Sequence, residues 1–234
     1  MIKQRFICLF VLLCSLLQFS LPAQQAPLEP KEFLAEIRRP LNQDVWGEIT
    51  GRITHAAEGK EPLSGELRVR ITFSKTSLHA QVILNNNNVY GFEQKHLPGE
   101  QVSTSLSRPE KEVPPGLFAF GLEPEDLTFS FLYWNFLEEL PRQKSRMREC
   151  RVMKLAHPDG TGTVQVWFDA EYGFPLEAWW YKTGETSPWR KLEMKGAKKH
   201  ANGLWFVKEM RLDGTAWKTR VIFDFASLNE IGSQ

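Results

Sequence analysis

Cysteine is scarce in this sequence, which contains three cysteines in 234 residues. Two of them, Cys8 and Cys14, lie in the apolar N-terminal segment, so Cys150 is the only cysteine in the remainder of the chain. A disulfide framework is therefore excluded within that remainder, and its stability has to come from packing. Cys150 lies in a segment of alternating polarity, where a single cysteine is usually a small buried apolar group.

Recognisable catalytic and nucleotide-binding motifs are also missing. The sequence contains no G-x-S-x-G elbow, no P-loop, no H-E-x-x-H and no Cys-x-x-Cys pair. Its five histidines are scattered without the spacing of metal ligands. The paired acids Glu125-Asp126 and Glu138-Glu139 fit the ends of helices or strands, where capping or solvation explains them better than acid–base catalysis. We therefore expect a protein that is not an enzyme and uses no cofactor or metal.

The longest apolar run of the sequence lies at its N-terminus. Lys3 and Arg5 precede residues 6–17, which are almost all apolar, as is typical of a secretory signal peptide. Polar residues and Pro22 interrupt the run before it reaches the length of about 20 apolar residues that a membrane span needs. We predict that residues 1–23 are a cleaved signal peptide and that residues 24–234 form a single domain with one core.

Neither sign of charge dominates the sequence, which has 29 basic and 28 acidic residues. Removal of residues 1–23 takes away two basic residues and no acidic one, which leaves 27 basic against 28 acidic residues. Such a balance gives no bulk electrostatic attraction to nucleic acid.

From residue 45 onward the period of the apolar residues is two. Leu67, Val69, Ile71 and Phe73 alternate with polar residues, which is typical of a strand with one dry face and one wet face. Short turns connect such segments, so neighbouring strands have to be antiparallel. About ten strands cannot remain a flat open sheet. We predict a mainly β (α+β) fold, in which a strongly curved antiparallel sheet forms an incomplete barrel. The later strands are expected at residues 150–155, 164–169, 176–181, 189–195, 204–212 and 215–225.

Two short helices are expected beside the sheet. Residues 30–39 place apolar side chains at helical spacing and end before Pro40. A second helix is expected to begin at Pro124, with acids in its first turn. Residues 94–125 form a proline-rich segment without regular alternation, and loops of that length are usually functional or disordered. We expect the helices to act as a lid on the concave side of the sheet.

The hairpin at residues 164–181 (VQVWFDAEYGFPLEAWWY) carries an unusual number of aromatic residues. Because side chains alternate along a strand, Trp180 is expected to face inward. Trp167 and Trp179 are expected to form a cross-strand aromatic pair on the outer face. The pattern leaves open whether the inward residues are ordinary core or the lining of a ligand cavity. The inward set is Val164, Val166, Phe168, Leu176, Ala178 and Trp180.

A basic segment precedes Cys150. Arg142, Lys144, Arg146 and Arg148 alternate with other residues, so on a single strand these four cations would project from one face. That face is either an ordinary solvated surface or a contact for anionic lipid headgroups, to which each cation would contribute about 1 kcal/mol.

Several short motifs follow one another along the chain in a recognisable order. They are residues 65–67 (GEL), 121–127 (GLEPEDL), 148–152 (RECRV), 166–169 (VWFD), 174–176 (FPL), 203–205 (GLW) and 218–219 (KT). Together with the signal peptide and the N-terminal helix, they give the sequence a resemblance to the outer membrane lipoprotein-sorting protein family. This family is similar to the periplasmic lipoprotein carriers LolA and LolB.

The resemblance implies a periplasmic carrier that works without nucleotide or metal. An incomplete barrel with a helical lid would hold the acyl chains of lipoproteins or lipids in a hydrophobic cavity. The cargo would come from inner-membrane release machinery and leave for an outer-membrane acceptor, and the carrier is expected to be a monomer. The predicted mobile cover is Phe118, Phe120, Phe129, Leu132 and Trp134. The predicted wall is Val69, Ile71, Val166, Phe168, Leu176, Trp180, Phe206, Val221 and Phe223.

Two other functions stay open at this point. An envelope sensor or interaction module with the same fold and a filled core would bind a protein partner through Trp167 and Trp179. Its signature would be an exposed aromatic patch and no cavity. A hydrolase would need carboxylates that converge in a cleft, which a sequence cannot show.

Overall fold

The structure is a computed structural model that describes residues 28–38, 44–74, 76–95, 102–196, 198–199 and 205–230. The predicted signal peptide lies outside the described residues. Among the described residues, no helix is both long enough and apolar enough to cross a membrane.

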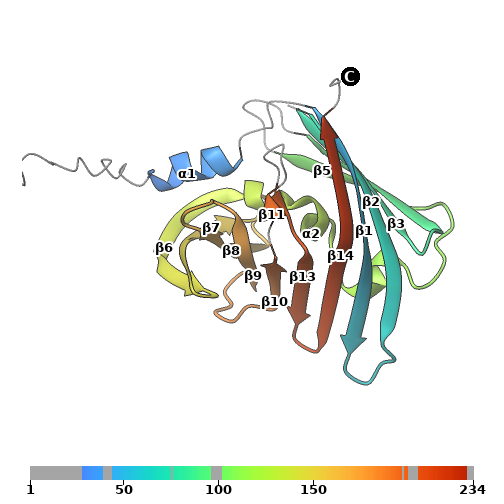
Figure 1. Cartoon of the computed structure of the whole chain (residues 1–234). Coiled ribbons are helices and arrows are strands. Elements are labelled where there is room, and N and C mark those ends of the chain that lie inside the picture. Colours follow the sequence, from blue (N-terminus) through green and yellow to red (C-terminus); the bar gives the residue numbers. More distant parts are fainter. Residues whose placement is uncertain are drawn as a thin grey trace, which may run out of the picture.

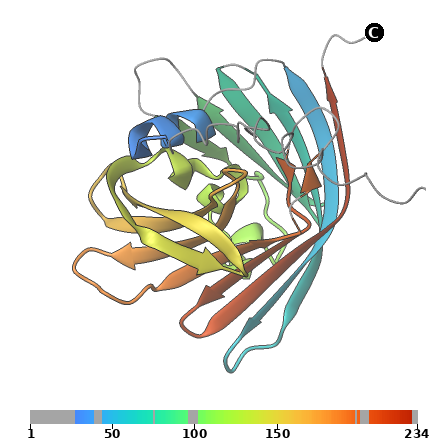
Figure 2. The ribbon, with the colours of Figure 1, turned by 60° about the vertical axis from the view of Figure 1, so that its left-hand side comes forward.

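Within the described part of the chain, twelve strands form one antiparallel sheet, in the spatial order β5-β4-β3-β2-β1-β14-β13-β10-β9-β8-β7-β6. The sheet curves strongly and stays open between its edge strands β5 and β6 (Figures 1 and 2). The predicted curved antiparallel sheet is thereby confirmed. Its strands are β1 (Val45–Ala57), β2 (Leu63–Phe73), β3 (Ser77–Leu84), β4 (Asn88–Lys95), β5 (Ser103–Ser107), β6 (Asn135–Ser145), β7 (Arg148–Ala156), β8 (Gly162–Asp169), β9 (Pro175–Lys182), β10 (Arg190–Lys195), β13 (Glu209–Gly214) and β14 (Trp217–Glu230). A separate pair consists of β11 (Lys198–Lys199) and β12 (Trp205–Phe206).

The pairing of β14 with β1 joins the two halves of the sheet. One half is the meander β1 to β5, and the other half runs from β6 to β14. The ladder between β1 and β14 shifts register between Thr50 and Gly51. A Cβ atom at Gly51 would collide with the backbone oxygen of Ile222, so this bulge needs a glycine.

The helices are short. They are α1 (Pro30–Ile37), α2 (Pro124–Thr128) and two 3₁₀ helices, η1 (Leu117–Phe120) and η2 (Ser130–Tyr133). In Figures 1 and 2, α2 lies within the curve of the sheet and α1 lies across the end formed by β6 and β7. Reciprocal hydrogen bonds of a capping box between Glu123 and Asp126 fix the start of α2. The second helix therefore begins at Pro124 as predicted.

The concave side of the sheet holds the main core. In the half that contains β8 and β9, aromatic side chains fill the interior. Phe33 of α1 packs edge-on against Phe168 with ring centroids 5.6 Å apart, and Phe131 of η2 packs against Trp180 at 5.1 Å. A partly buried ion pair between Arg151 and Glu139 and a hydrogen bond from Arg151 to the carbonyl of Leu28 hold α1 against this end of the sheet.

A second, smaller core lies on the other face of the sheet. It contains Cys150, Val152, Trp167 and Leu176. The prediction that Leu176 faces the concave side is wrong. Phe168 pairs with Pro175 and Trp167 pairs with Glu177, so Leu176 is the extra residue of a β-bulge. The bulge breaks the strict alternation on which the prediction depended.

The proline-rich segment is more regular than the sequence suggested. It contains the edge strand β5 and the 3₁₀ helix η1. Asn88 exchanges two hydrogen bonds with the backbone of Val113, and the hydroxyl of Tyr90 donates to Glu112 and accepts from the N–H of Leu117. Residues 112–117 are therefore fastened to β4.

Candidate functional site

An apolar cavity of about 520 Å³ lies between the concave face of the sheet and the segment from α2 through η2. We call residues 124–134 the cover segment. The sheet contributes apolar side chains from β1 to β3, β13 and β14, and the cover segment contributes three more. The sheet side chains are Ile49, Val69, Ile71, Phe73, Leu78, Ala80, Val82, Met210 and Phe223, and those of the cover segment are Leu127, Phe129 and Leu132.

Five of the predicted ligand-binding residues line this cavity. They are Val69, Ile71, Phe129, Leu132 and Phe223. Phe120, Val166, Phe168, Trp180 and Val221 are buried in the main core instead. The difference arises because Phe33 and Phe131 fill the half of the sheet around β8 and β9, which leaves the hollow beside β2 and β3.

The other predicted residues lie elsewhere. Leu176 belongs to the second core, and the side chain of Phe206 lies outside the described part of the structure. Phe118 packs edge-on against Tyr90, and the guanidinium of Arg108 lies 4.5 Å from its ring centroid. Trp134 lines a separate cleft and contacts the ring of His157. Because residues 112–117 are fastened to the sheet, Phe118 does not fit the role of a mobile cover.

The cover segment is attached to the sheet by a buried ion pair that sequence reasoning missed. Asp126 of α2 contacts Arg190 of β10, and their side chains are 0% and 2% exposed. Burial raises the pKa of Asp126 to about 6, against the opposing effect of Arg190. The guanidinium of Arg190 also lies 4.8 Å from the ring centroid of Trp180. The sequence did contain a signal for a buried ion pair. Arg190 alternates in step with the inward-facing residues Leu192 and Met194, so its side chain is expected to face inward, where a charge needs a partner.

Arg38 provides a second attachment of the cover segment. Its Nε donates to the carbonyl of Leu132 at 2.7 Å, and its Nη2 donates to the carbonyl of Trp134 at 2.8 Å. Burial lowers the pKa of this guanidinium. Sequence reasoning assigned this arginine only to the C-terminal end of the first helix. The contact connects that end of α1 to the last turn of η2.

The predicted aromatic pair on the outer face is present but covered. The ring centroids of Trp167 and Trp179 are 4.6 Å apart, and Nζ of Lys191 lies 4.0 Å from the ring centroid of Trp179. Trp167 is only 4% exposed, and its Nε1 donates to Gln143 at 3.1 Å. The pair is therefore not an exposed apolar patch.

The four cations of the basic segment do not share one strand face. Arg146 and Met147 have positive φ angles of 49° and 69° and form the turn between β6 and β7. The condition of a single strand, under which the four cations would share a face, is therefore not met, because the chain reverses in the middle of the segment. Lys144 pairs with Glu149, Arg146 with Glu193 and Arg148 with Asp169, whereas Arg142 is exposed. These carboxylates offset much of the positive charge.

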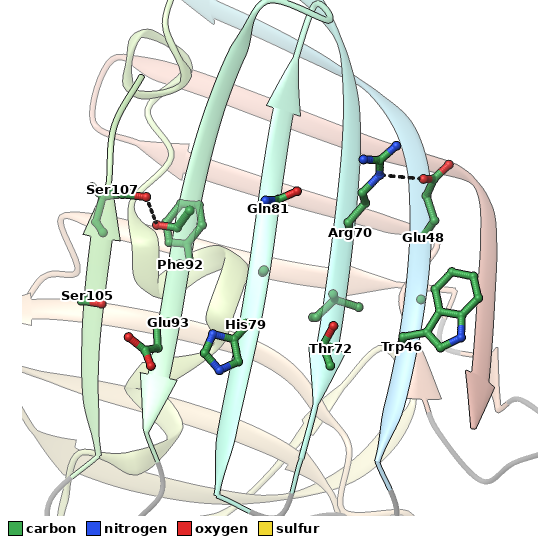
Figure 3. A pocket seen from close by; sticks show the side chains of 15 residues that line it. Trp46, Glu48, Arg70, Thr72, His79, Gln81, Phe92, Glu93, Ser105 and Ser107 are labelled. Carbon is green, nitrogen blue, oxygen red and sulfur yellow. Dashed lines mark hydrogen bonds and ion pairs between the residues drawn. The ribbon is translucent and has the colours of Figure 1, made fainter. Parts of the chain in front are cut away.

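A broad groove of about 680 Å³ lies on the outer face of β1 to β5 (Figure 3). Figure 3 shows that side chains such as Thr72, His79 and Gln81 line it, and that Arg70 pairs with Glu48 across neighbouring strands at 3.1 Å. Trp46 lies at one side of the groove and is 48% exposed. Charged and polar side chains contribute more to the lining of this groove than to the lining of the cavity, so the groove is less suited to an alkyl chain.

Within the described residues, no group of three or more His, Cys, Asp or Glu side chains is arranged to hold a metal ion. The cavity has a mostly aliphatic and aromatic lining with a few polar groups at its margin, such as Asp126 and Thr128. Its volume falls within the range of roughly 300–1,000 Å³ that is typical of small-molecule pockets. The arrangement can hold an apolar ligand and can shield it from water.

Comparison with known proteins identifies the fold. No protein-family model matches the sequence, and no curated protein matches it either. The solved structures that align with most of the chain include the following three. A DUF1329 family protein from Desulfovibrio piger has a TM-score of 0.61 and 15% identity over 86% of this chain and 90% of its own.

The other two structures carry names that match the resemblance seen in the sequence. A domain titled as an outer membrane lipoprotein-sorting protein domain from Vibrio parahaemolyticus has a TM-score of 0.58 and 12% identity, covering 86% of this chain and 92% of that one. A LolA superfamily protein from Nitrosomonas europaea also has a TM-score of 0.58 and 12% identity, covering 87% and 95%. Identities this low concern the fold alone. The chain therefore has the fold of LolA-like and outer membrane lipoprotein-sorting proteins, as its sequence predicted.

Proposed function

We propose that this protein is a periplasmic carrier that binds an acyl chain of a lipid or lipoprotein in the cavity beneath the cover segment. The observation that carries the proposal is the cavity itself, an apolar hollow of about 520 Å³ left between Val69, Ile71 and Phe223 of the sheet and Phe129 and Leu132 of the cover segment. The fold of the similar structures supports the same class of function.

The free energy of binding would come from removal of methylene groups from water. Each buried methylene contributes about 0.8 kcal/mol, so ten buried carbons contribute on the order of 8 kcal/mol. Side chains such as Val69 and Phe129 make such contacts without a fixed direction, so chains of different structure can be accepted. A carrier of this kind needs no nucleotide, metal or catalytic group, because the acceptor draws the chain out by binding it more tightly.

Entry and release require the cover segment to move. Only five residues form α2 and four form η2, so this segment has little internal stability of its own. Its position depends on the buried pair of Asp126 with Arg190 and on the bonds from Arg38. We propose that loosening of these attachments opens the cavity.

The cellular setting that we propose is based on the predicted signal peptide and on the fold. Residues 1–23 would direct export, and the mature monomer would take its cargo from inner-membrane release machinery and give it to an outer-membrane acceptor. The alternative of a protein-binding module is less well supported, because Trp167 is almost completely buried and the interior contains a cavity.

Uptake of a fluorescent fatty acid by the purified mature protein tests the proposal. We expect saturable uptake of one chain per protein and a co-purifying acylated species in native mass spectrometry. Val69→Glu places a charge in the cavity wall and is expected to reduce affinity at least about tenfold. Val89→Glu makes the same change at a residue that is 43% exposed and serves as the matched control.

Two results would contradict the carrier function. One is a wild-type protein that is folded, carries no lipid and takes up no fatty acid. The other is equal affinity in the wild type and Val69→Glu, with circular dichroism showing that the variant is folded.

A further inference from the structure

A second, smaller cleft of about 260 Å³ lies near the opening of the sheet. Edge strand β5 contributes Thr104 and Leu106 to one side of it. The other side is formed by the cover segment, just before the opposite edge strand β6, and by His157 after β7. We call this space the seam cleft. Neither the predicted wall nor the resemblance assigns a role to it.

The cover segment separates the seam cleft from the apolar cavity. Leu127, Phe129 and Leu132 line the cavity, whereas Glu125 and Ser130 line the cleft. Tyr133 lines both spaces. The two spaces therefore adjoin at Tyr133, and a movement of this side chain would let one amphiphile hold its alkyl chain in the cavity and its polar head in the cleft.

Two polar side chains of the cleft have no hydrogen-bond or ion-pair partner among the residues that the structure describes. Ser130 is only 8% exposed, and its hydroxyl makes no hydrogen bond to any residue that the structure describes. The carboxyl group of Glu125 is partly buried and, among the described residues, takes part in no hydrogen bond or ion pair. A hydroxyl and a carboxyl group that line the same cleft without such a partner are available to a ligand or to water.

The charges around the cleft favour a cation. Asp126, next to Glu125, is paired with Arg190, and Asp159 is bonded to His157. Glu125 is the carboxylate without a counterpart. Burial raises its pKa, although Arg190 and His157 act in the opposite direction. A positive charge beside it would offset the cost of its partial removal from water.

We infer that the seam cleft binds the primary ammonium head of an amphiphile whose alkyl chain lies in the cavity, with Glu125 and Ser130 as hydrogen-bond acceptors. An ammonium group carries three donors and a compact charge, which suits a cleft lined by both a carboxylate and a hydroxyl. This inference rests on the proposed function, since it assigns a headgroup class to the ligand of the same cavity.

Competition among probes of equal chain length tests the inference. Dodecylamine, which is an ammonium ion at pH 7, dodecanol and laurate would each displace a fluorescent fatty acid from the mature protein, below their micelle concentrations. We expect dodecylamine to bind about tenfold more tightly than dodecanol, because a charge-assisted hydrogen bond replaces a neutral one. Laurate is expected to bind most weakly of the three.

Variants assign the preference to the cleft. Glu125→Gln removes the charge with little change in shape and is expected to bring dodecylamine to within about twofold of dodecanol. Ser130→Ala is expected to reduce the preference by a smaller factor. Glu58→Gln, at an exposed residue between β1 and β2, is the control and should keep the full preference.

The outcomes separate this inference from the proposed function. Equal binding of all three probes to the wild type would overturn the inference and leave the carrier function in place. A preference for dodecylamine that persists in folded Glu125→Gln would also overturn it. Failure of every probe and of the fatty acid to bind would overturn both.

Discussion

Asp126 and Arg190 lie 64 positions apart in the sequence and form an ion pair whose two side chains are almost completely removed from solvent. One residue belongs to the cover segment and the other to the sheet, so the pair fixes the cover on the wall of the cavity. Oδ2 of Asp126 also accepts from the backbone N–H of Glu123 at 2.7 Å. The start of α2 and its attachment to the sheet therefore depend on one carboxyl group.

Removal of one member of this pair is expected to be strongly destabilising. Asp126→Ala leaves Arg190 buried without a counter-ion, which costs about 3–5 kcal/mol in the free energy of unfolding. Chemical denaturation measures the loss. The control is Asp224→Ala, which breaks the exposed pair with Arg52 and should cost less than about 1 kcal/mol. Equal losses in the two variants would argue against a structural role for the buried pair.

The fastening of the proline-rich segment gives a second prediction. Tyr90→Phe removes the acceptor of the buried N–H of Leu117 and the donor to Glu112, which costs about 1–3 kcal/mol. Limited proteolysis is expected to cut residues 108–116 faster in this variant. Tyr181→Phe removes a longer bond of 3.3 Å to Gln165 and should leave the proteolysis rate unchanged. An unchanged pattern in Tyr90→Phe would mean that Asn88 alone holds the segment.

The sheet was predictable because its signals are local. Alternation at Leu67, Val69 and Ile71 marks a strand, and short turns between such strands require antiparallel pairing. The start of α2 was equally visible, because Pro124 and the acids after it belong to the helix itself. The contact of Trp167 with Trp179 follows from strand parity on both sides of the hairpin.

Features that depend on a single extra residue or on distant partners were not predictable. The sequence alternates without interruption through Leu176 and through Arg146-Met147. In the structure, a bulge at the first and a turn at the second interrupt the strand, so the side chains do not stay on the faces that the alternation predicts. The partner of Asp126 could not be found by spacing. Alternation also predicts which residues face inward, but it does not distinguish residues of a packed core from residues that line a cavity. That distinction depends on where Phe33 and Phe131 pack.

The raised pKa of Asp126 gives a prediction for pH. The folded protein has a pKa of about 6 at this carboxyl, against an ordinary value of 3.8, so it binds the proton more tightly than the unfolded chain. The stability that the tighter proton binding contributes is fully present below pH 3.8, and it is lost as pH rises through about 6. We expect the stability of the wild type relative to Asp126→Asn to fall as pH rises between these two values.

Glu209 provides the control of opposite sign. Hydrogen bonds from Arg220 and Arg211 lower its pKa to about 2, so its contribution to stability is lost as pH falls below its ordinary value. The stability of the wild type relative to Glu209→Gln should therefore fall with acidification. Chemical denaturation measures both differences if the pH series extends from about 2, the pKa of folded Glu209, to about 6, the pKa of folded Asp126. Parallel curves for the wild type and Asp126→Asn would show that Asp126 does not titrate in this range.

The contact of Arg38 with the cover segment leads to a prediction about ligand release. Its guanidinium donates to the carbonyls of Leu132 and Trp134, and each hydrogen bond to a charged donor contributes about 1.5–3 kcal/mol. If the cover has to lift before the ligand leaves, Arg38→Ala lowers the barrier to opening. We expect dissociation of a fluorescent fatty acid, measured by stopped flow, to become about tenfold faster or more.

Two comparisons decide whether this effect belongs to the cover. Arg38→Lys keeps the charge but cannot donate to two carbonyls in the fixed geometry of a guanidinium, so it should release the ligand at an intermediate rate. Arg142→Ala removes an exposed arginine on β6 and should not change the rate. Hydrogen exchange at the backbone amides of Leu132 and Trp134 should accelerate together with release. Faster exchange with an unchanged rate of release would show that the ligand leaves without opening of this segment.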